Sequence, residues 1–258
     1  GSLDHKELNL VYNKAFQTNS LSIGGSYLKT DNNYDYLVPQ SFTSSNQSNT
    51  EPLRNNQFEK KNLYVNNNLA FNSQKIRLTL QYNEQQKALP NYQNNTPENA
   101  SSLSSDTWRL GYNHSIYTDI EWLDNLEFEA NQEIKKERYL DILADITRLD
   151  ANYDTTKTHA GLTSSSTFDS QYGVFGISPF IEVNKQQFDS LSFDNNGQIN
   201  CNGISSCDVI AEQTQLLIGS RFEWTQNNGP YSAYSLLTQL NEENQNIAVN
   251  QADAETFN

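Results

Sequence analysis

The stretch Lys75-Ile-Arg-Leu-Thr-Leu-Gln-Tyr82 alternates strictly between polar and apolar side chains. Its even-numbered side chains are apolar and its odd-numbered ones are polar or charged. Successive side chains of a strand point to opposite faces, so this pattern predicts a β-strand with one apolar and one wet face. The stretch Asp124-Asn-Leu-Glu-Phe-Glu-Ala-Asn131 divides in the same way, with acidic and amide side chains on its polar face.

Similar alternation predicts ten strands along the chain, and the connections between them alternate between short and long. The predicted strands are 8–16, 21–29, 63–71, 75–82, 107–115, 124–131, 159–168, 173–184, 214–224 and 231–239. The predicted connections are 17–20, 30–62, 72–74, 84–106, 116–123, 132–158, 169–172, 185–213 and 225–230. Tight turns at one end and long loops at the other are typical of an outer-membrane barrel.

The pattern therefore predicts an all-β fold, an antiparallel transmembrane β-barrel with short periplasmic turns and long extracellular loops. About ten strands of a larger barrel are expected, as one partial barrel domain over residues 1–258. A soluble β-sandwich or jelly roll also has many strands of this length. It offers no reason for every long loop to lie at one end, and long loops without structure are uncommon in compact domains.

Composition excludes several classes of function. A formal net charge of −14 argues against nucleic-acid binding, which needs clustered Lys and Arg. His5, His114 and His159 are scattered without a nucleophile at a recognisable spacing, so we expect no catalytic residues and no enzyme. No metal site or cofactor is predicted either. The stretch Asp194-Asn-Asn-Gly197 has oxygen ligands suited to calcium, but the position where a calcium loop needs Glu holds Ser.

The two cysteines, Cys201 and Cys207, lie close together within the connection 185–213. Two cysteines without a neighbouring histidine are too few for a zinc site and indicate a small disulfide. A disulfide implies an oxidising compartment such as the periplasm or the cell surface. Two free thiols are the alternative.

The stretch from Leu78 to Asn95 resembles part of the TonB-dependent outer-membrane receptors. In that family a strand that ends in an aromatic residue leads into a Lys-Gly-(Leu or Ile)-Pro-like turn, and here the turn is Lys87-Ala88-Leu89-Pro90, with Ala in place of Gly. The stretch Glu137-Arg-Tyr-Leu-Asp141 is similar to the end of an early barrel strand, and the two cysteines to those of a surface loop. The resemblance implies a 22-stranded barrel in the cell outer membrane, with a plug domain that lies outside these 258 residues.

The expected function is import of a scarce nutrient complex, such as a siderophore, haem, cobalamin or metal. Expected partners are outer-membrane lipid, the nutrient ligand and TonB, which the plug would contact. Candidate ligand-binding residues in the loops are Tyr34, Tyr36, Arg54, Tyr92 and Asp194. A passive porin or surface barrel, and a soluble all-β binding module, remain as alternatives.

Overall fold

The computed structural model describes residues 4–32, 34–37, 50–90, 95–96, 98–143, 147–193, 209–227, 229, 231–248 and 256–257. These residues form strands and their connections. Within these ranges there is no helix that is long and apolar enough to cross a membrane.

Ten long strands and three very short ones make up the fold. The long strands are β1 (Lys6–Ala15), β2 (Asn19–Thr30), β5 (Phe58–Phe71), β6 (Gln74–Ala88), β7 (Ser102–Ile120), β8 (Leu123–Leu143), β9 (Thr147–Ser170), β10 (Gly173–Phe193), β11 (Val209–Thr225) and β12 (Ser232–Ala248). The short strands are β3 (Asp35–Leu37), β4 (Thr50–Pro52) and β13 (Thr256–Phe257). The ten strands that the sequence predicts are therefore confirmed, and most are longer than predicted.

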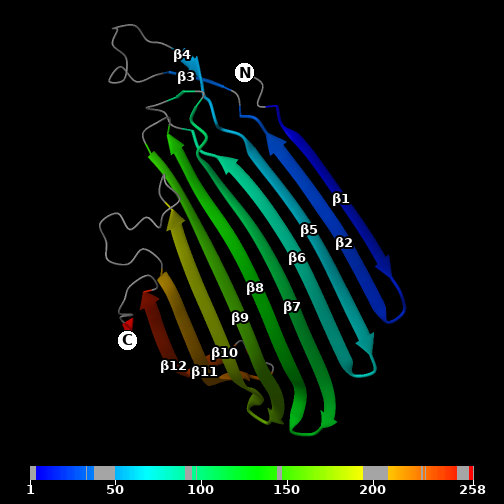
Figure 1. The fold of residues 1–258 in the computed structure, drawn as a ribbon. Coiled ribbons are helices and arrows are strands. Elements are labelled where there is room, and N and C mark those ends of the chain that lie inside the picture. Colours follow the sequence, from blue (N-terminus) through cyan, green and yellow to red (C-terminus); the bar gives the residue numbers. More distant parts are fainter. Residues whose placement is uncertain are drawn as a thin grey trace.

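The long strands form one antiparallel meander in which each strand pairs with its neighbours in the chain (Figure 1). Strands β3 and β4 form a separate ribbon within the connection from β2 to β5. The sheet curls but does not close: β1 lies at one edge, and β12, with the two-residue β13 paired to it, lies at the other (Figure 1). The fold is thus an open ten-stranded sheet, and the closure expected of a barrel is not present among the described strands.

All the short turns lie at the same end of the sheet (Figure 1). One of the two-residue turns joins β5 to β6 through Asn72 and Ser73, and Asn72 adopts a left-handed conformation with φ of 50°. Asparagine tolerates this conformation better than most residues, which suits it to a tight hairpin. The prediction that the short turns share one end of the sheet is therefore confirmed.

The long loop predicted over 132–158 is wrong. Strands β8 and β9 run through most of it and pair continuously from Asn125 opposite Ser165 to Leu143 opposite Thr147. Both faces of this extension carry polar side chains, so alternation of hydrophobicity could not reveal it. Backbone hydrogen bonds and ion pairs stabilise it instead, including one between Arg138 and Asp150 at 2.6 Å.

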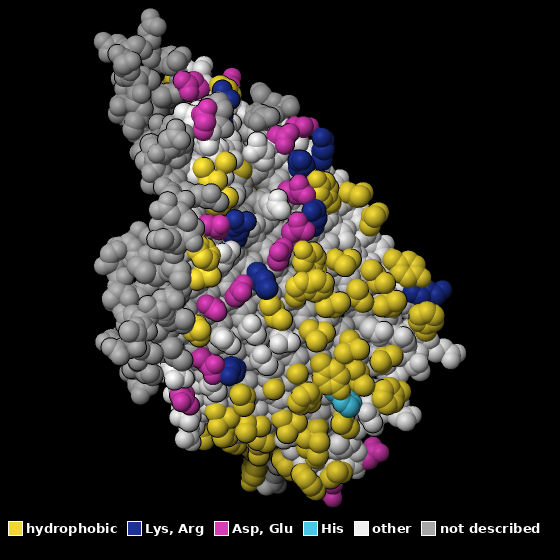
Figure 2. Space-filling view, viewed as in Figure 1, with side chains coloured by type: hydrophobic (Ala, Val, Ile, Leu, Met, Phe, Trp, Pro, Cys, Tyr) yellow, Lys and Arg dark blue, Asp and Glu magenta, His cyan; other side chains and the backbone are white. Residues whose placement is uncertain are grey.

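The two faces of the sheet differ in composition and in burial. The concave face is polar, and several of its small side chains are buried in the curve, such as Thr107 and Ala151. The convex face is apolar and remains open to its surroundings (Figure 2). Large apolar side chains such as Leu78 and Ile218 are 41% and 47% exposed there. The residues that the structure describes therefore form no conventional apolar core beneath the sheet.

Candidate functional site

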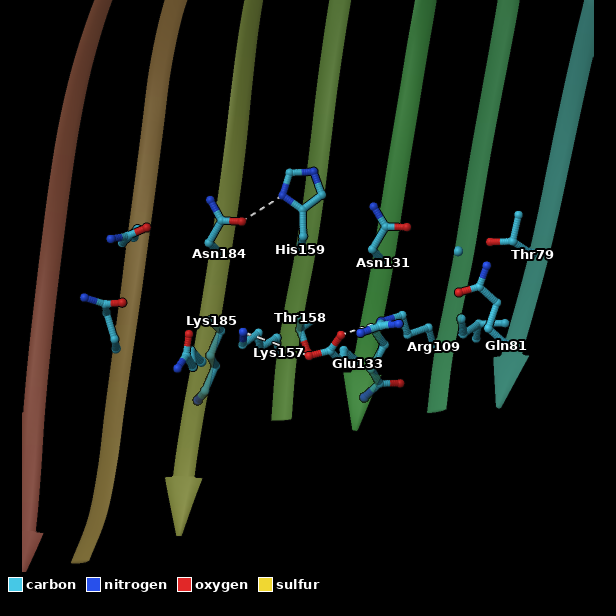
Figure 3. Close-up of a pocket in the computed structure, with 16 residues that line it drawn as sticks. Thr79, Gln81, Arg109, Asn131, Glu133, Lys157, Thr158, His159, Asn184 and Lys185 are labelled. Carbon is cyan, nitrogen blue, oxygen red and sulfur yellow. Dashed lines mark hydrogen bonds and ion pairs between the residues drawn. The ribbon is translucent and has the colours of Figure 1, made fainter. Parts of the chain in front are cut away.

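The concave face carries two adjacent rows of polar side chains that cross the sheet at mid-height. Pairing between strands brings together, in one row, Thr79, Gly111, Asn131, His159, Asn184, Gln215 and Glu242. The next row contains Gln81, Arg109, Glu133, Lys157, Gln186, Gln213 and Asn244. Figure 3 shows many of these side chains on neighbouring strands. We call these two rows the polar belt.

The centre of the polar belt is hollow. A cavity of about 500 Å³ lies over β6 to β11 and is lined mainly by the two rows. Gly111 lies at its floor, where an added Cβ would come within 2.9 Å of the Asn131 Oδ1 atom and closer still to Thr79. The missing side chain lets these two neighbours lean over the glycine. A volume of this size is typical of small-molecule sites.

An ion-pair network crosses three strands at the bottom of the hollow. The Arg109 Nε atom lies 2.5 Å from an oxygen of Glu133, and the Lys157 Nζ atom lies 3.9 Å from its other oxygen (Figure 3). Lys185 borders the hollow by its position on β10, but its side chain points to the convex face and lies 2.6 Å from Glu212 there. The two cationic side chains that face the hollow thus share the carboxylate of Glu133, and Glu242 adds a second negative charge to the polar belt, which leaves little positive charge for an anionic ligand.

Amide groups dominate the rest of the hollow. The His159 Nδ1 atom lies 2.8 Å from the side-chain oxygen of Asn184 (Figure 3). Gln213 and Gln215 donate to the two oxygens of Glu242 at 2.9 and 3.0 Å. Each amide presents both donors and an acceptor, so the surface is equipped to hydrogen-bond a neutral polar molecule.

An aromatic pair stands beside the hollow, on the side of the long connections. Tyr153 and Phe188 lie on β9 and β10 with ring centroids 6.1 Å apart and planes inclined by 20°. Both face the concave side, because they share the alternation of Lys157 and Gln186 on the same strands. They provide apolar ring surface next to the amide groups.

The convex face is the second candidate surface, and its apolar side chains form a band that has the same height on β6 and on β11. On β6 the band runs from Tyr82 to the position of Gln74, which pairs with Phe71. On β11 it runs from Leu216 to Trp224. Both intervals are eight residues, or roughly 27 Å along a strand. We call this the apolar band (Figure 2).

Aromatic and charged residues mark the borders of the apolar band. At the border near the long connections, Tyr82 and Trp108 contact each other with ring centroids 4.5 Å apart. The next outward position belongs to a charged pair, Lys61 and Glu84, at 3.0 Å. At the other border, every short turn has an exposed aromatic side chain in it or close to it. Examples are Phe16, Phe71, Trp122, Tyr172 and Tyr231.

Three of the ligand-binding residues predicted from the sequence lie together at the long-connection end. Tyr34 accepts a backbone hydrogen bond from Leu53 at 2.9 Å, which holds it near Arg54. Tyr36 lies on β3 and is half-buried, and burial together with the nearby Glu51 raises its pKa above the usual value. The three belong to the β3–β4 ribbon and its flank, away from the polar belt.

The other predicted site residues are not among those the structure describes. Tyr92, Asp194 and both cysteines, Cys201 and Cys207, fall outside the described ranges. Their proposed roles in ligand binding and in a disulfide therefore stay predictions. Within the described ranges, no cluster of three or more His, Cys, Asp or Glu side chains is placed to hold a metal ion.

A cluster of hydrogen-bonded polar residues, which the sequence did not predict, links the connections at one end of the sheet. The Asn55 side chain donates to the backbone oxygens of Leu89 and Ser101 at 2.9 and 2.7 Å. The Ser101 hydroxyl in turn donates to Asp141 at 2.5 Å. These contacts join the segment that follows β4 to the connection between β6 and β7, and that connection to the last residues of β8. The sequence did not predict the polar belt as a site either. It did place Thr79 and Gln81 on the polar face, which the structure confirms.

Comparison with known proteins yields no match: no protein-family model fits the chain, and no curated protein matches its sequence. The geometry defines the class of protein. It is an all-β protein with a large antiparallel meander sheet, apolar on its convex face and polar on its concave face from β5 to β11, whereas on β12 Leu236 and Leu240 face the concave side.

Proposed function

We propose that this sheet is the wall of an outer-membrane β-barrel, with the apolar band in lipid and the polar belt facing the lumen. The observation that carries the proposal is the apolar band itself. Large apolar side chains stay exposed across the convex face, including Leu63, Leu78, Leu110, Phe128 and Ile218. Soluble proteins rarely expose so large a continuous apolar surface unless another apolar phase covers it.

The height of the band supports lipid as that phase. Eight residues span roughly 27 Å along a strand, and the strands of membrane barrels tilt by roughly 40°. The band would then be about 20 Å high, close to the roughly 25 Å expected for a barrel. The aromatic residues at both borders match the girdles at the two membrane interfaces.

The path of the band across the sheet supports tilted strands. The row that passes through Leu80 and Leu110 becomes polar farther on, where it reaches Thr158, Lys185 and Thr214. The row that forms the border of the band at Tyr82 reaches β11 at Glu212. On β11, however, the band begins at Leu216, which lies four residues nearer to the short turns. A flat membrane cuts tilted strands obliquely, so this drift is expected of a barrel wall.

The open edges of the sheet also bear on the proposal. Strand β1 pairs on one side only among the described strands. Unpaired backbone groups are very costly in lipid, so the outer edge of β1 needs a partner strand there. We infer that further strands complete the barrel.

Within this class we favour a TonB-dependent receptor that imports a scarce nutrient complex across the outer membrane. The resemblance at Lys87-Ala88-Leu89-Pro90 supports it, and so does a lumen face with a cavity that suits a small molecule. A passive porin is the second candidate. The near balance of charge in the polar belt supports a porin, because a lumen with little net charge admits neutral solutes.

The decisive experiment is to refold the full-length protein, with the strands that complete the barrel, in the presence and in the absence of lipid. In vesicles of outer-membrane phospholipid, we expect β-structure, protection of the convex face and migration with the lipid on flotation. In plain buffer the apolar band should drive association. A monomer that unfolds cooperatively in buffer without detergent would refute the membrane assignment.

A further inference from the structure

The lining of the polar belt indicates which class of molecule it binds. Of the side chains that border the hollow, most are amides or hydroxyls, among them Thr79, Gln81, Asn131, Gln186 and Gln215. Its charged members are paired with each other, as Arg109 and Lys157 are with Glu133. Glu242 supplies the second negative charge of the polar belt, so the belt offers many hydrogen bonds and almost no net charge.

We propose that the polar belt binds a neutral polyhydroxylated ligand, of the class of short oligosaccharides. Planar amides and paired ions donate and accept at neighbouring positions, as vicinal hydroxyl groups require. An anionic ferric complex would instead need cations without carboxylate partners, and the cations that border the hollow have such partners. This inference rests on the proposed function, because it takes the concave face to be the lumen.

The aromatic pair beside the hollow supplies the other half of such a site. A sugar ring has a face of C–H groups that packs against an aromatic ring, and Tyr153 and Phe188 present nearly parallel rings. Phe188 lies two residues beyond Gln186 on β10, and Tyr153 lies four residues from Lys157 on β9. A chain of a few sugar units would therefore reach from the hollow to the aromatic pair.

The size of the hollow fits this ligand. A cavity of about 500 Å³ is within the range of small-molecule sites and suits part of an oligosaccharide rather than an extended polymer. The hollow is also open along the polar belt, since the two rows continue to Gln213 and Asn244. Further sugar units can lie along the rows without meeting an apolar barrier.

Titration calorimetry on the protein in a detergent without a sugar headgroup tests the proposal. The probes are maltopentaose, cellopentaose, xylopentaose and chitopentaose, with ferric citrate as the anionic comparison. We expect at least one oligosaccharide to bind and ferric citrate not to compete with it. Asn131→Leu should weaken that binding about tenfold, as the loss of one hydrogen bond does.

Matched variants separate recognition from folding. Asn83→Leu removes an amide from the same concave face outside the hollow and should leave affinity unchanged. Tyr153→Ala should weaken binding several-fold by removing the stacking surface, whereas Tyr153→Phe should retain it.

Binding of none of the four oligosaccharides, or equal affinity in all variants, would overturn the proposal. Flotation of the same preparation with lipid vesicles keeps the two proposals apart. Flotation without oligosaccharide binding refutes the ligand class alone. Failure to float refutes the membrane barrel.

Discussion

Replacing Leu78 with arginine tests the membrane assignment at its most sensitive point. Leu78 lies on the convex face, 41% exposed, four residues from Tyr82 and four from Gln74. It is therefore at the middle of the apolar band, roughly 13 Å along the strand from either border. In a membrane barrel, arginine at the midplane costs about 2–4 kcal/mol of the free energy of unfolding.

Arginine substitutions at two neighbouring positions test how the loss of stability depends on depth in the membrane and on the face of the sheet. Leu80 lies two residues nearer to the border at Tyr82, so Leu80→Arg should cost less than Leu78→Arg, about 2 kcal/mol. Thr79 lies between them and faces the polar belt. Thr79→Arg should therefore cost under about 1 kcal/mol, because the new charge stays in water.

The assay is urea unfolding of the three variants from phospholipid vesicles, followed by tryptophan fluorescence. Trp108, Trp122 and Trp224 supply the signal. A soluble sheet has water on its convex face, where exchange of an exposed residue usually changes stability by no more than about 0.5 kcal/mol. Similar small losses for Leu78→Arg and Thr79→Arg would refute the assignment of the convex face to lipid.

Two more predictions concern the long-connection end. Cys201 and Cys207 should resist thiol alkylation until the protein is reduced, and full labelling without reductant would contradict the predicted disulfide. Asn55 has φ of 55° and donates two side-chain hydrogen bonds, so Asn55→Ala should cost about 2 kcal/mol in urea unfolding. Asn55→Gly loses the hydrogen bonds but not the backbone fit and should cost about half as much, whereas equal losses would contradict this division.

Alternation of side chains predicted where the strands run but not how far. It located all ten long strands, because a strand between lipid or protein and water must alternate locally. It failed where β8 and β9 continue beyond the apolar band, since both faces are polar there. On β8, for example, Lys135 and Glu137 form an ion pair at 2.8 Å on the same face of the strand. Nothing in the local pattern distinguishes such a stretch from a loop.

The polar belt depended on information that no single stretch contains. Arg109, Glu133 and Lys157 belong to three different strands and become neighbours only through the pairing of β7, β8 and β9. A shift of one residue in either pairing would turn these side chains to opposite faces. The sequence showed that Thr79 and Gln81 face away from the apolar side, but not which residues lie opposite them.

The sequence by itself determined the strands, their antiparallel order and which side chains share a face, because these follow from the two-residue repeat and from short turns. The tertiary structure decided the register, the height and drift of the apolar band and the hollow over Gly111. It also left the sheet open. These features depend on hydrogen bonds between distant segments and on the curvature of the whole sheet, and neither is encoded in any local run of residues.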